Sequence, residues 1–524
     1  MLPSLMALAG CDVLDTIPTD RLSAEVYWQT DQDAAYAANA IYQYLEAPGT
    51  LLGRDEMSDI ATATFETSAE IKVEQSIADR QTDIFLNTWN DMYRGIRRCN
   101  DYMANVGKIT PADAAAVSRY TAEVRALRCY FYSRLASYFG DVPLVTTPIG
   151  IGESKALTRT PVSQIYDFIY AEATEAAKYL PSAASAGGRV TKGAAFGILA
   201  RAMLFAAGNV TGADSRAAYY YEKAKAAADS AIALNVYDLS TPYAGLFTYA
   251  NESGKEVVFE KQYIRDNFSN AVFNNFGAVS LGTGGPRMSP TLVLLDEYEM
   301  QNGKKIAEAG SGYSDMNPYA NRDPRLSYTL YYPGATLPNG SAYDSRPGAG
   351  ADAVEADYRV SKTGLLPKKY INPEDLNLRS NCAINLIIIR YAEILLTAAE
   401  ARIELNQELP VAQDYINQIR QRADVNMPVI TATSQADLRD AVRHERMVEL
   451  ALEGNRFFDI RRWKIAEAAC TGPVKGMRYV AEGATEPSLY TFNRSKTFRA
   501  RDYLWPVPYN EQQLSPELSQ NTGW

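Results

Sequence analysis

Histidine and cysteine are scarce in this chain of 524 residues, which contains one histidine and five cysteines. A site built from several histidines is therefore excluded, and His444 is the only possible member of a Ser-His or Cys-His pair. The cysteines are scattered without CxxC spacing, at Cys11, Cys99, Cys129, Cys382 and Cys470. We expect neither a metal centre nor a cofactor, and we expect the last four cysteines to be buried thiols.

Long hydrophobic runs and clusters of basic residues are also missing. Beyond the first ten residues, apolar stretches such as 193–200 and 384–389 fall far below the roughly 20 residues that a membrane-spanning helix needs. The 62 acidic residues outnumber the 52 basic ones, and the net charge is −10. This balance disfavours non-specific attraction to nucleic acid. We therefore expect no membrane-spanning helix and no nucleic-acid partner.

The hydrophobic content of 47% is enough for a large core in a chain of this length. Apolar residues recur at helical spacing in several segments. These segments are 85–106 with 112–139, 192–207 with 216–234, 390–406 with 411–423, and the single helix 162–180. Their small and large apolar residues resemble those of tetratricopeptide helix pairs, which bury a continuous core only when stacked. The sequence predicts a mainly α fold: one compact body of helix pairs, with long irregular loops and a few short strands.

Two segments have a different composition and are expected to carry specificity. Residues 49–83 form a polar connection, and residues 263–370 are rich in Gly, Asn, Asp, Ser and Pro with interspersed aromatics. A sugar ring can stack its apolar face on an aromatic ring while polar side chains bond its hydroxyls. The candidate ligand residues are Phe65, Phe268, Phe276, Tyr313 and Tyr343, with Asn267, Asn275 and Arg287 as polar partners. For each aromatic, packing against its own loop is the alternative.

Residues 444–463 contain the densest cluster of charge. Their apolar spacing predicts one amphipathic helix on which Glu445, Glu449 and Glu453 stack one turn apart. The nearby arginines that could neutralise them are Arg443, Arg446, Arg456, Arg461 and Arg462. Glu445 and Glu449 should lie about 5–6 Å apart, close to the roughly 5–5.5 Å of retaining glycosidases. Both carboxylates project from the same face of one helix, so they cannot lie on opposite sides of a scissile bond. We therefore predict a structural cluster and no enzymatic activity.

The first ten residues form a short apolar segment that ends before a cysteine. Leu8, Ala9, Gly10 and Cys11 resemble a bacterial lipobox, in which the cysteine is lipidated and becomes the first mature residue. No Lys or Arg precedes Arg21, so the basic region typical of a signal peptide is missing. We expect residues 1–10 to be a signal remnant and Cys11 to carry a lipid anchor; a frayed apolar segment is the alternative.

Motifs along nearly the whole chain are similar to those of one family. After the lipobox and DVLDTIPTDRL, they are WNDMYRGIRRCN (89–100), AEVRALRCYFYSRLASYFGDVPLVTTPI (122–149), GRVTKGAA (188–195), RDPRLSYT (322–329), RYAEILLTAAEA (390–401), ER..EL.LEG.R..D.RRW (445–463) and YLWPVPYNEQQL with QNTGW (503–524). In this order they resemble the SusD-like (SusD/RagB) family, the surface lipoproteins with which Bacteroidetes capture glycans. The tryptophans within these motifs are expected to be scaffold residues.

The resemblance implies a lipid-anchored protein exposed at the surface of the outer membrane. Its helical body would sit on a SusC-like TonB-dependent transporter, and its loops would hold an oligosaccharide or polysaccharide without chemistry. Residues 11–262 would form an N-terminal helix-pair half, and residues 263–524 a loop-rich ligand region with a C-terminal helix-pair half, in one structural unit. A peptide or other nutrient as ligand, or a helix-repeat scaffold for protein partners, are the alternatives. No binding residue is carried over from the family.

Overall fold

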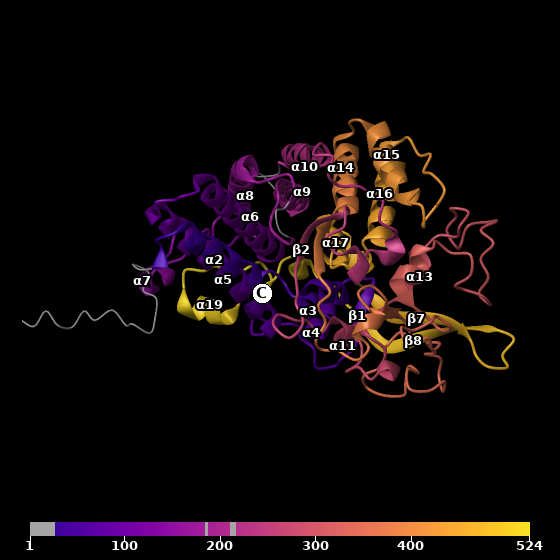
Figure 1. Cartoon of the computed structure of the whole chain (residues 1–524). Helices are drawn as coiled ribbons and strands as arrows, with labels where there is room; N and C mark the ends of the chain where they lie inside the picture. Colours follow the sequence, from indigo (N-terminus) through magenta and orange to yellow (C-terminus); the bar gives the residue numbers. More distant parts are fainter. Residues whose placement is uncertain (1–26, 184–186, 210–215) are drawn as a thin grey trace, which may run out of the picture.

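The computed structural model describes residues 27–183, 187–209 and 216–524. Figure 1 shows the helices of residues 31–179 at one end of the body and those of residues 391–449 at the other, with irregular loops below the latter; the last helix, 509–514, lies at the N-terminal end. Cys11 and the predicted signal remnant lie outside the described residues. The longer helices are α2 (Asp31–Ile41), α5 (Asp83–Asn105), α6 (Ala114–Phe139), α8 (Val162–Tyr179), α9 (Lys192–Asn209), α10 (Ala217–Ile232), α14 (Tyr391–Leu405), α15 (Leu409–Arg420) and α16 (Gln435–Glu449).

Every helix predicted in the tetratricopeptide-like pairs is present within a few residues of its expected bounds. Local signals define the ends. The carboxylate of Asp113 accepts a hydrogen bond from the N–H of Ala116 at the start of α6, as an N-cap should. Gly140, with φ of 70°, ends that helix, and Asn406, with φ of 53°, ends α14. Both residues adopt conformations that favour Gly and Asn.

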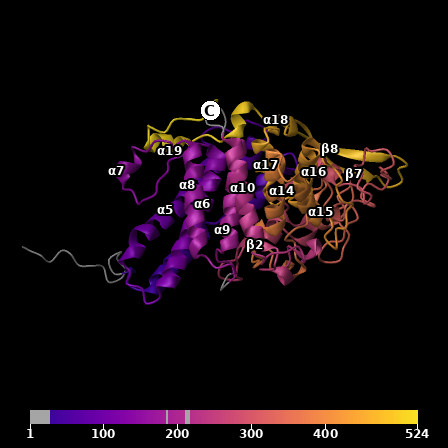
Figure 2. The ribbon, with the colours of Figure 1, turned by 90° about the horizontal axis from the view of Figure 1, so that it is seen from above.

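The helices pack side by side in one continuous row, as Figure 2 shows from above. In order, α5 contacts α6, α6 contacts α8, α8 contacts α9, α9 contacts α10, α10 contacts α14, and α14 contacts α15 and α16. The contact between α10 and α14 joins segments far apart in the sequence, so the two halves share one core. The mainly α, compact architecture is thus confirmed, while the division near residue 262 stays a prediction.

Small antiparallel sheets connect the loops to this row of helices. Among the described residues they are four two-stranded sheets. Their strands are β1 (Ala61–Ala63) with β3 (Met288–Pro290), β2 (Val257–Lys261) with β6 (Leu386–Arg390), β4 (Leu330–Tyr331) with β5 (Leu366–Pro367), and β7 (Gly472–Val480) with β8 (Pro487–Lys496). The β7–β8 hairpin projects from the body (Figure 1). The remaining short helices are α3 (Pro48–Leu51), α4 (Ala69–Glu74), α7 (Ile151–Ser154), α11 (Val272–Phe276), α12 (Leu292–Glu297), α13 (Arg325–Thr329), α17 (Arg456–Arg462), α18 (Ala466–Ala469) and α19 (Tyr509–Leu514).

The segment 444–463 is two helices, so the prediction of one continuous helix was wrong. Helix α16 ends at Glu449, and α17 begins at Arg456. Between them Leu452 and Gly454 have φ of 60° and 78°. A Cβ at Gly454 would lie 2.0 Å from the carbonyl oxygen of Leu51. The glycine thus permits a left-handed turn in close contact with another segment.

The charge-neutralised cluster is present, but its predicted cations were wrong. Glu445, Glu449 and Glu453 are buried. They pair with residues from distant segments, namely Arg325, Arg390, Arg420, Arg422 and Lys369. Although burial raises the pKa of Glu449, the guanidinium groups of Arg390, Arg422 and Arg325 hold it well below its ordinary value. The predicted arginines have other contacts: Arg446 and Arg462 pair with Asp459, and Arg456 pairs with Asp59.

Residues 49–83, which were predicted to be a polar connection, contain most of α3 and all of β1 and α4. Most of the segment up to Thr64 is buried. Its polar groups have partners: Asp55 accepts the N–H groups of Gly454 and Phe457, at 2.9 and 3.4 Å. Glu74 accepts the hydroxyl of Thr62 and pairs with basic residues of β8. Satisfied polar side chains can be buried, and composition alone did not reveal that they are satisfied.

Asp55 should make stability depend on pH. Burial raises the pKa of its carboxyl from 3.8 to about 7, so the folded state binds this proton more tightly than the unfolded chain. The resulting contribution to the free energy of unfolding is full below the unfolded pKa and is lost as the pH rises through about 7. In Asp55→Asn, the difference in melting temperature between pH 5 and pH 8 should shrink. Asp440→Asn, at an exposed position of α16, should leave this difference unchanged. If the wild type and both variants showed the same difference in melting temperature, Asp55 would not be the group responsible.

Candidate functional site

Two predicted ligand aromatics lie inside the protein. The rings of Phe276 and Tyr343 are each 1% exposed and belong to the main hydrophobic core. Neither ring offers a face on which a sugar could stack, so packing, the alternative considered for loop aromatics, applies to both. Both rings pack their loops against the helical body.

Three other predicted residues are brought together by the pairing of β1 with β3. The N–H of Thr64, next to Phe65, donates to the carbonyl oxygen of Arg287 at 2.7 Å. The N–H of Arg287 donates in turn to the carbonyl oxygen of Asn275 at 2.7 Å. Phe65, Asn275 and Arg287 are all half-buried. We call this group, with Glu70 at 3.3 Å from the Arg287 guanidinium, the Arg287 site.

Two members of the Arg287 site, Arg287 and Glu70, line a cavity of about 210 Å³ between α3, α4 and α5, whereas Phe65 and Asn275 lie outside its lining. Thr50, Asn87 and Asp91 lie at its exposed rim, whereas Tyr138 and Trp505 are buried residues of its lining. The rings of Tyr138 and Trp505 stack at a centroid distance of 4.2 Å. The indole N–H of Trp505 is buried and has no hydrogen-bond partner among residues 27–183, 187–209 and 216–524. The cavity therefore has two buried aromatic rings in its lining, and one of them carries an N–H without a partner among the described residues.

Phe268 and Asn267 lie elsewhere, beside β2. Phe268 is 45% exposed and stacks on Tyr263, with centroids 5.3 Å apart and ring planes 9° apart. It lines a cavity of about 400 Å³ together with Lys261 of β2. Asn267 is exposed on the same turn. The structure thus separates these two predicted residues from the Arg287 site.

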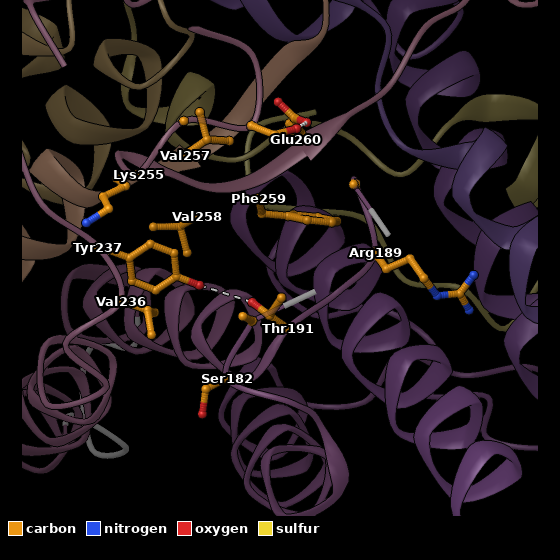
Figure 3. Close-up of a pocket in the computed structure, with 15 residues that line it drawn as sticks. Ser182, Arg189, Thr191, Val236, Tyr237, Lys255, Val257, Val258, Phe259 and Glu260 are labelled. Carbon is orange, nitrogen blue, oxygen red and sulfur yellow. Dashed lines mark hydrogen bonds between the residues drawn. The ribbon is translucent and has the colours of Figure 1, made fainter. Parts of the chain in front are cut away.

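A second cavity of about 360 Å³ adjoins the one beside Phe268 (Figure 3). Within it, the hydroxyls of Tyr237 and Thr191 lie 3.1 Å apart, at the dashed line in the figure. Arg189 lines both cavities and pairs with Glu123 of α6 at 2.7 Å. We call the pair the β2 cavities. Sequence reasoning missed them, although two charged residues at the end of the apolar strand VVFEK were a usable signal.

Tyr313 occupies a third, separate position. Its ring lies under the guanidinium of Arg322, at 5.5 Å from the centroid. Burial raises the pKa of its hydroxyl to about 12. The structure places it near Asp296 and Asp315, which pair with Arg478, rather than near another predicted ligand residue.

The structure gives no support to the glycosidase geometry on α16. Glu445 and Glu449 have no exposed surface and bind arginines. In the part of the chain that the structure describes, no cluster of three or more His, Cys, Asp or Glu side chains could hold a metal ion. The four described cysteines are free and buried, as expected. None of the described helices combines the length and apolar character needed to cross a membrane.

Comparison with known proteins gives consistent matches along the chain. Residues 255–524 match the model of the SusD family, and residues 19–204 match a model described as starch-binding and associating with the outer membrane. SusD-like protein P2 of Formosa agariphila is 26% identical over 99% of this chain and 96% of its own length. The structure of a SusD-like carbohydrate-binding protein of Bacteroides fragilis has a TM-score of 0.84 and 27% identity, covering 94% of this chain and all of that one. A second SusD-like protein of that species has a TM-score of 0.83 and 26% identity, covering 97% of this chain and all of that one. This chain belongs to the SusD family.

Proposed function

We propose that the protein captures oligosaccharides at the cell surface, at the Arg287 site, and delivers them to a SusC-like TonB-dependent transporter. The supporting observation is that backbone hydrogen bonds of Arg287 with Thr64 and with Asn275, next to the β1–β3 pair, place Phe65, Asn275 and Arg287 close together from two distant segments. The related protein of Bacteroides fragilis is described as carbohydrate-binding. In this proposal the protein binds its ligand and leaves the covalent structure unchanged.

Each residue of the Arg287 site has a distinct role in this proposal. Arg287 has a side chain that is 34% exposed, and its guanidinium would donate to sugar hydroxyl or ring oxygens. Asn275 would supply both a donor and an acceptor, and Phe65 an apolar face for stacking. The terminal ring of the glycan would enter the cavity beside Trp505, whose free indole N–H would bond a hydroxyl oxygen. The size of that cavity favours recognition of chain ends over long internal stretches.

Delivery would depend on a lipid anchor and on the transporter. Acylation of Cys11 would hold the protein at the outer membrane, since each buried methylene contributes about 0.8 kcal/mol of membrane affinity. The helical body would then cover the transporter as a lid. Cys11→Ala should release the protein from membranes, and a tag at the C-terminus should co-isolate a barrel protein from outer membranes. A protein that stays membrane-bound without Cys11 and isolates alone would contradict this part of the proposal.

Arg287→Ala should weaken glycan binding by about tenfold or more, because a hydrogen bond from a charged group contributes about 1.5–3 kcal/mol. The ligand is first identified by affinity electrophoresis against a panel of polysaccharides, and the affinity is then measured by calorimetry. Arg216→Ala is the control, since Arg216 forms an ion pair with Asp167 on the helical row, where both side chains are about 40% exposed.

Product analysis accompanies these binding measurements. Equal affinities of the wild-type and Arg287→Ala proteins would exclude the Arg287 site. Shortened glycan products would contradict binding without chemistry, and retention of peptides in place of glycans would redirect the proposal to another nutrient.

A further inference from the structure

Strand β2 ends with two charged residues that are almost completely buried. Glu260 is 3% exposed and Lys261 is 6% exposed. Glu260 lines both β2 cavities, whereas Lys261 lines only the cavity beside Phe268. The cavities measure about 360 and 400 Å³, within the roughly 300–1,000 Å³ of small-molecule sites. Neither charge is needed for the strand pairing, since the ladder with β6 is formed by the backbone.

The carboxylate of Glu260 is only partly satisfied. Its Oε1 accepts from the hydroxyl of Ser253 at 2.7 Å and from the amide of Asn385 at 3.1 Å. Its Oε2 is buried, and no donor from the described residues reaches it. Buried polar atoms almost always have a partner, and a carboxylate oxygen accepts strong, charge-assisted hydrogen bonds. Because Glu260 lines both cavities, this oxygen is the acceptor for which a ligand could supply a donor.

Lys261 and the ring of Phe268 line the cavity beside Glu260, and Phe268 stacks on Tyr263 behind it. The ammonium of Lys261 donates to the carbonyl oxygens of Gln43 and Leu45, at 3.0 and 2.5 Å. It lies 5.3 Å from the ring centroid of Phe268 and 5.7 Å from that of Tyr263. An ammonium has three donors, so one remains beyond these two carbonyl contacts. The cavity thus offers a carboxylate acceptor, an ammonium donor and an exposed aromatic face.

This combination selects the chemistry of the ligand. A cationic ligand would be repelled by the ammonium of Lys261, whereas the guanidinium of Arg189, which lines both cavities, is already neutralised by Glu123. A purely apolar ligand would leave Glu260 without a donor. A saccharide supplies hydroxyls that both donate and accept, together with an apolar ring face that can stack on Phe268.

We propose that the β2 cavities are a second saccharide site, in which Glu260 Oε2 accepts a ligand hydroxyl and Phe268 stacks on the adjacent ring. Its location follows from the cavities themselves, while the ligand class rests in part on the proposed function. Within the described chain, the β2 cavities and the Arg287 cavity have no lining residue in common. Two sites would allow one chain to hold two stretches of glycan and raise its apparent affinity for long polymers.

The test is calorimetry with a panel of maltohexaose, cellohexaose, laminarihexaose, mannohexaose and xylohexaose. The wild-type protein should bind two molecules of the preferred hexaose per chain, and Arg287→Ala should retain one. On the Arg287→Ala background, Glu260→Gln should weaken the remaining site about tenfold to a hundredfold, because it replaces the free acceptor by a donor. Phe268→Ala, at a half-exposed position that the fold should tolerate, should also weaken it. Glu374→Gln, at an exposed carboxylate, is the matched control and should have no effect.

Melting temperatures separate a binding role from a structural one. Glu260→Gln should not lower the melting temperature, because the buried oxygen it replaces has no protein partner. The inference would be overturned if the wild-type protein bound only one hexaose and Arg287→Ala abolished that binding. It would also be overturned if neither Glu260→Gln nor Phe268→Ala changed the affinity. Either result would indicate that water occupies the β2 cavities. Binding lost only through Glu260→Gln would overturn the Arg287 site and leave this inference standing. If the wild-type protein bound none of the five hexaoses, the inference of a second saccharide site would be overturned as well.

Discussion

Arg390→Ala is expected to destabilise the protein by about 3–5 kcal/mol, the typical result of breaking a buried ion pair. Arg390 is 1% exposed. Its guanidinium contacts Glu256 at 2.9 Å, Glu449 at 2.7 Å and Glu453 at 2.8 Å. Alanine would leave these carboxylates with fewer cations in an environment that water does not reach. The lost attraction is therefore accompanied by the cost of burying unneutralised charge.

The Arg390 contacts also join distant parts of the molecule. Arg390 ends β6, Glu256 precedes β2, and Glu449 ends α16. Loss of the guanidinium should loosen the connection between the helical row and the sheets, and soluble expression should fall as well. Chemical denaturation followed by circular dichroism measures the change in the free energy of unfolding.

Arg216→Ala is the appropriate control for this experiment. Arg216 pairs with Asp167 at 3.0 Å, but their side chains are 40% and 44% exposed. Exposed pairs contribute about 0–1 kcal/mol, so this variant should unfold close to the wild type. Equal effects of the two substitutions would show that burial does not determine the contribution of Arg390.

Gly454→Ala is expected to cost about 2–5 kcal/mol. The residue has φ of 78°, where an L-residue other than glycine costs about 1–2 kcal/mol. In addition, the new Cβ would lie 2.0 Å from the carbonyl oxygen of Leu51, and overpacking of this kind costs about 1–3 kcal/mol. The backbone would have to move, which would also disturb the hydrogen bond from Gly454 to Asp55. Thermal unfolding of the variant measures the loss.

The variant Gly348→Ala separates the cost of the backbone conformation from the cost of the steric contact. Gly348 has φ of 79°, but an added Cβ there would meet no atom within 4 Å. This control should lose only the conformational part, about 1–2 kcal/mol. If both variants lose the same amount, the contact with Leu51 is not a constraint on the turn between α16 and α17.

Helices could be predicted closely because their signals are local. Apolar periodicity gave the bounds of α5, α6 and α14 within a few residues. The same periodicity misled at residues 444–463, since Met447, Leu450, Ala451 and Gly454 have helical spacing although the chain turns there. Helical spacing does not report that Gly454 must contact Leu51, a residue about 400 positions earlier.

The candidate site could be predicted only in part. Phe65, Asn275 and Arg287 were chosen as loop residues able to bind a sugar, and the β1–β3 pairing places them together. Phe276 and Tyr343 satisfied the same criterion, but both are in the core. Composition indicates where irregular segments are common, yet it does not tell which side chains of such a segment face solvent. Glu260 was not predicted because its significance depends on the cavities around it.

By itself the sequence determined the helical content, the charge balance and the ordered motifs that identify the family, because these depend on residues close together in the chain. Only the tertiary structure decided which cations neutralise Glu449, which aromatics remain exposed, and where cavities form. These features depend on contacts between segments far apart in sequence, such as β1 with β3 and β2 with β6. Such contacts arise from the packing of the whole chain, and no local pattern encodes them.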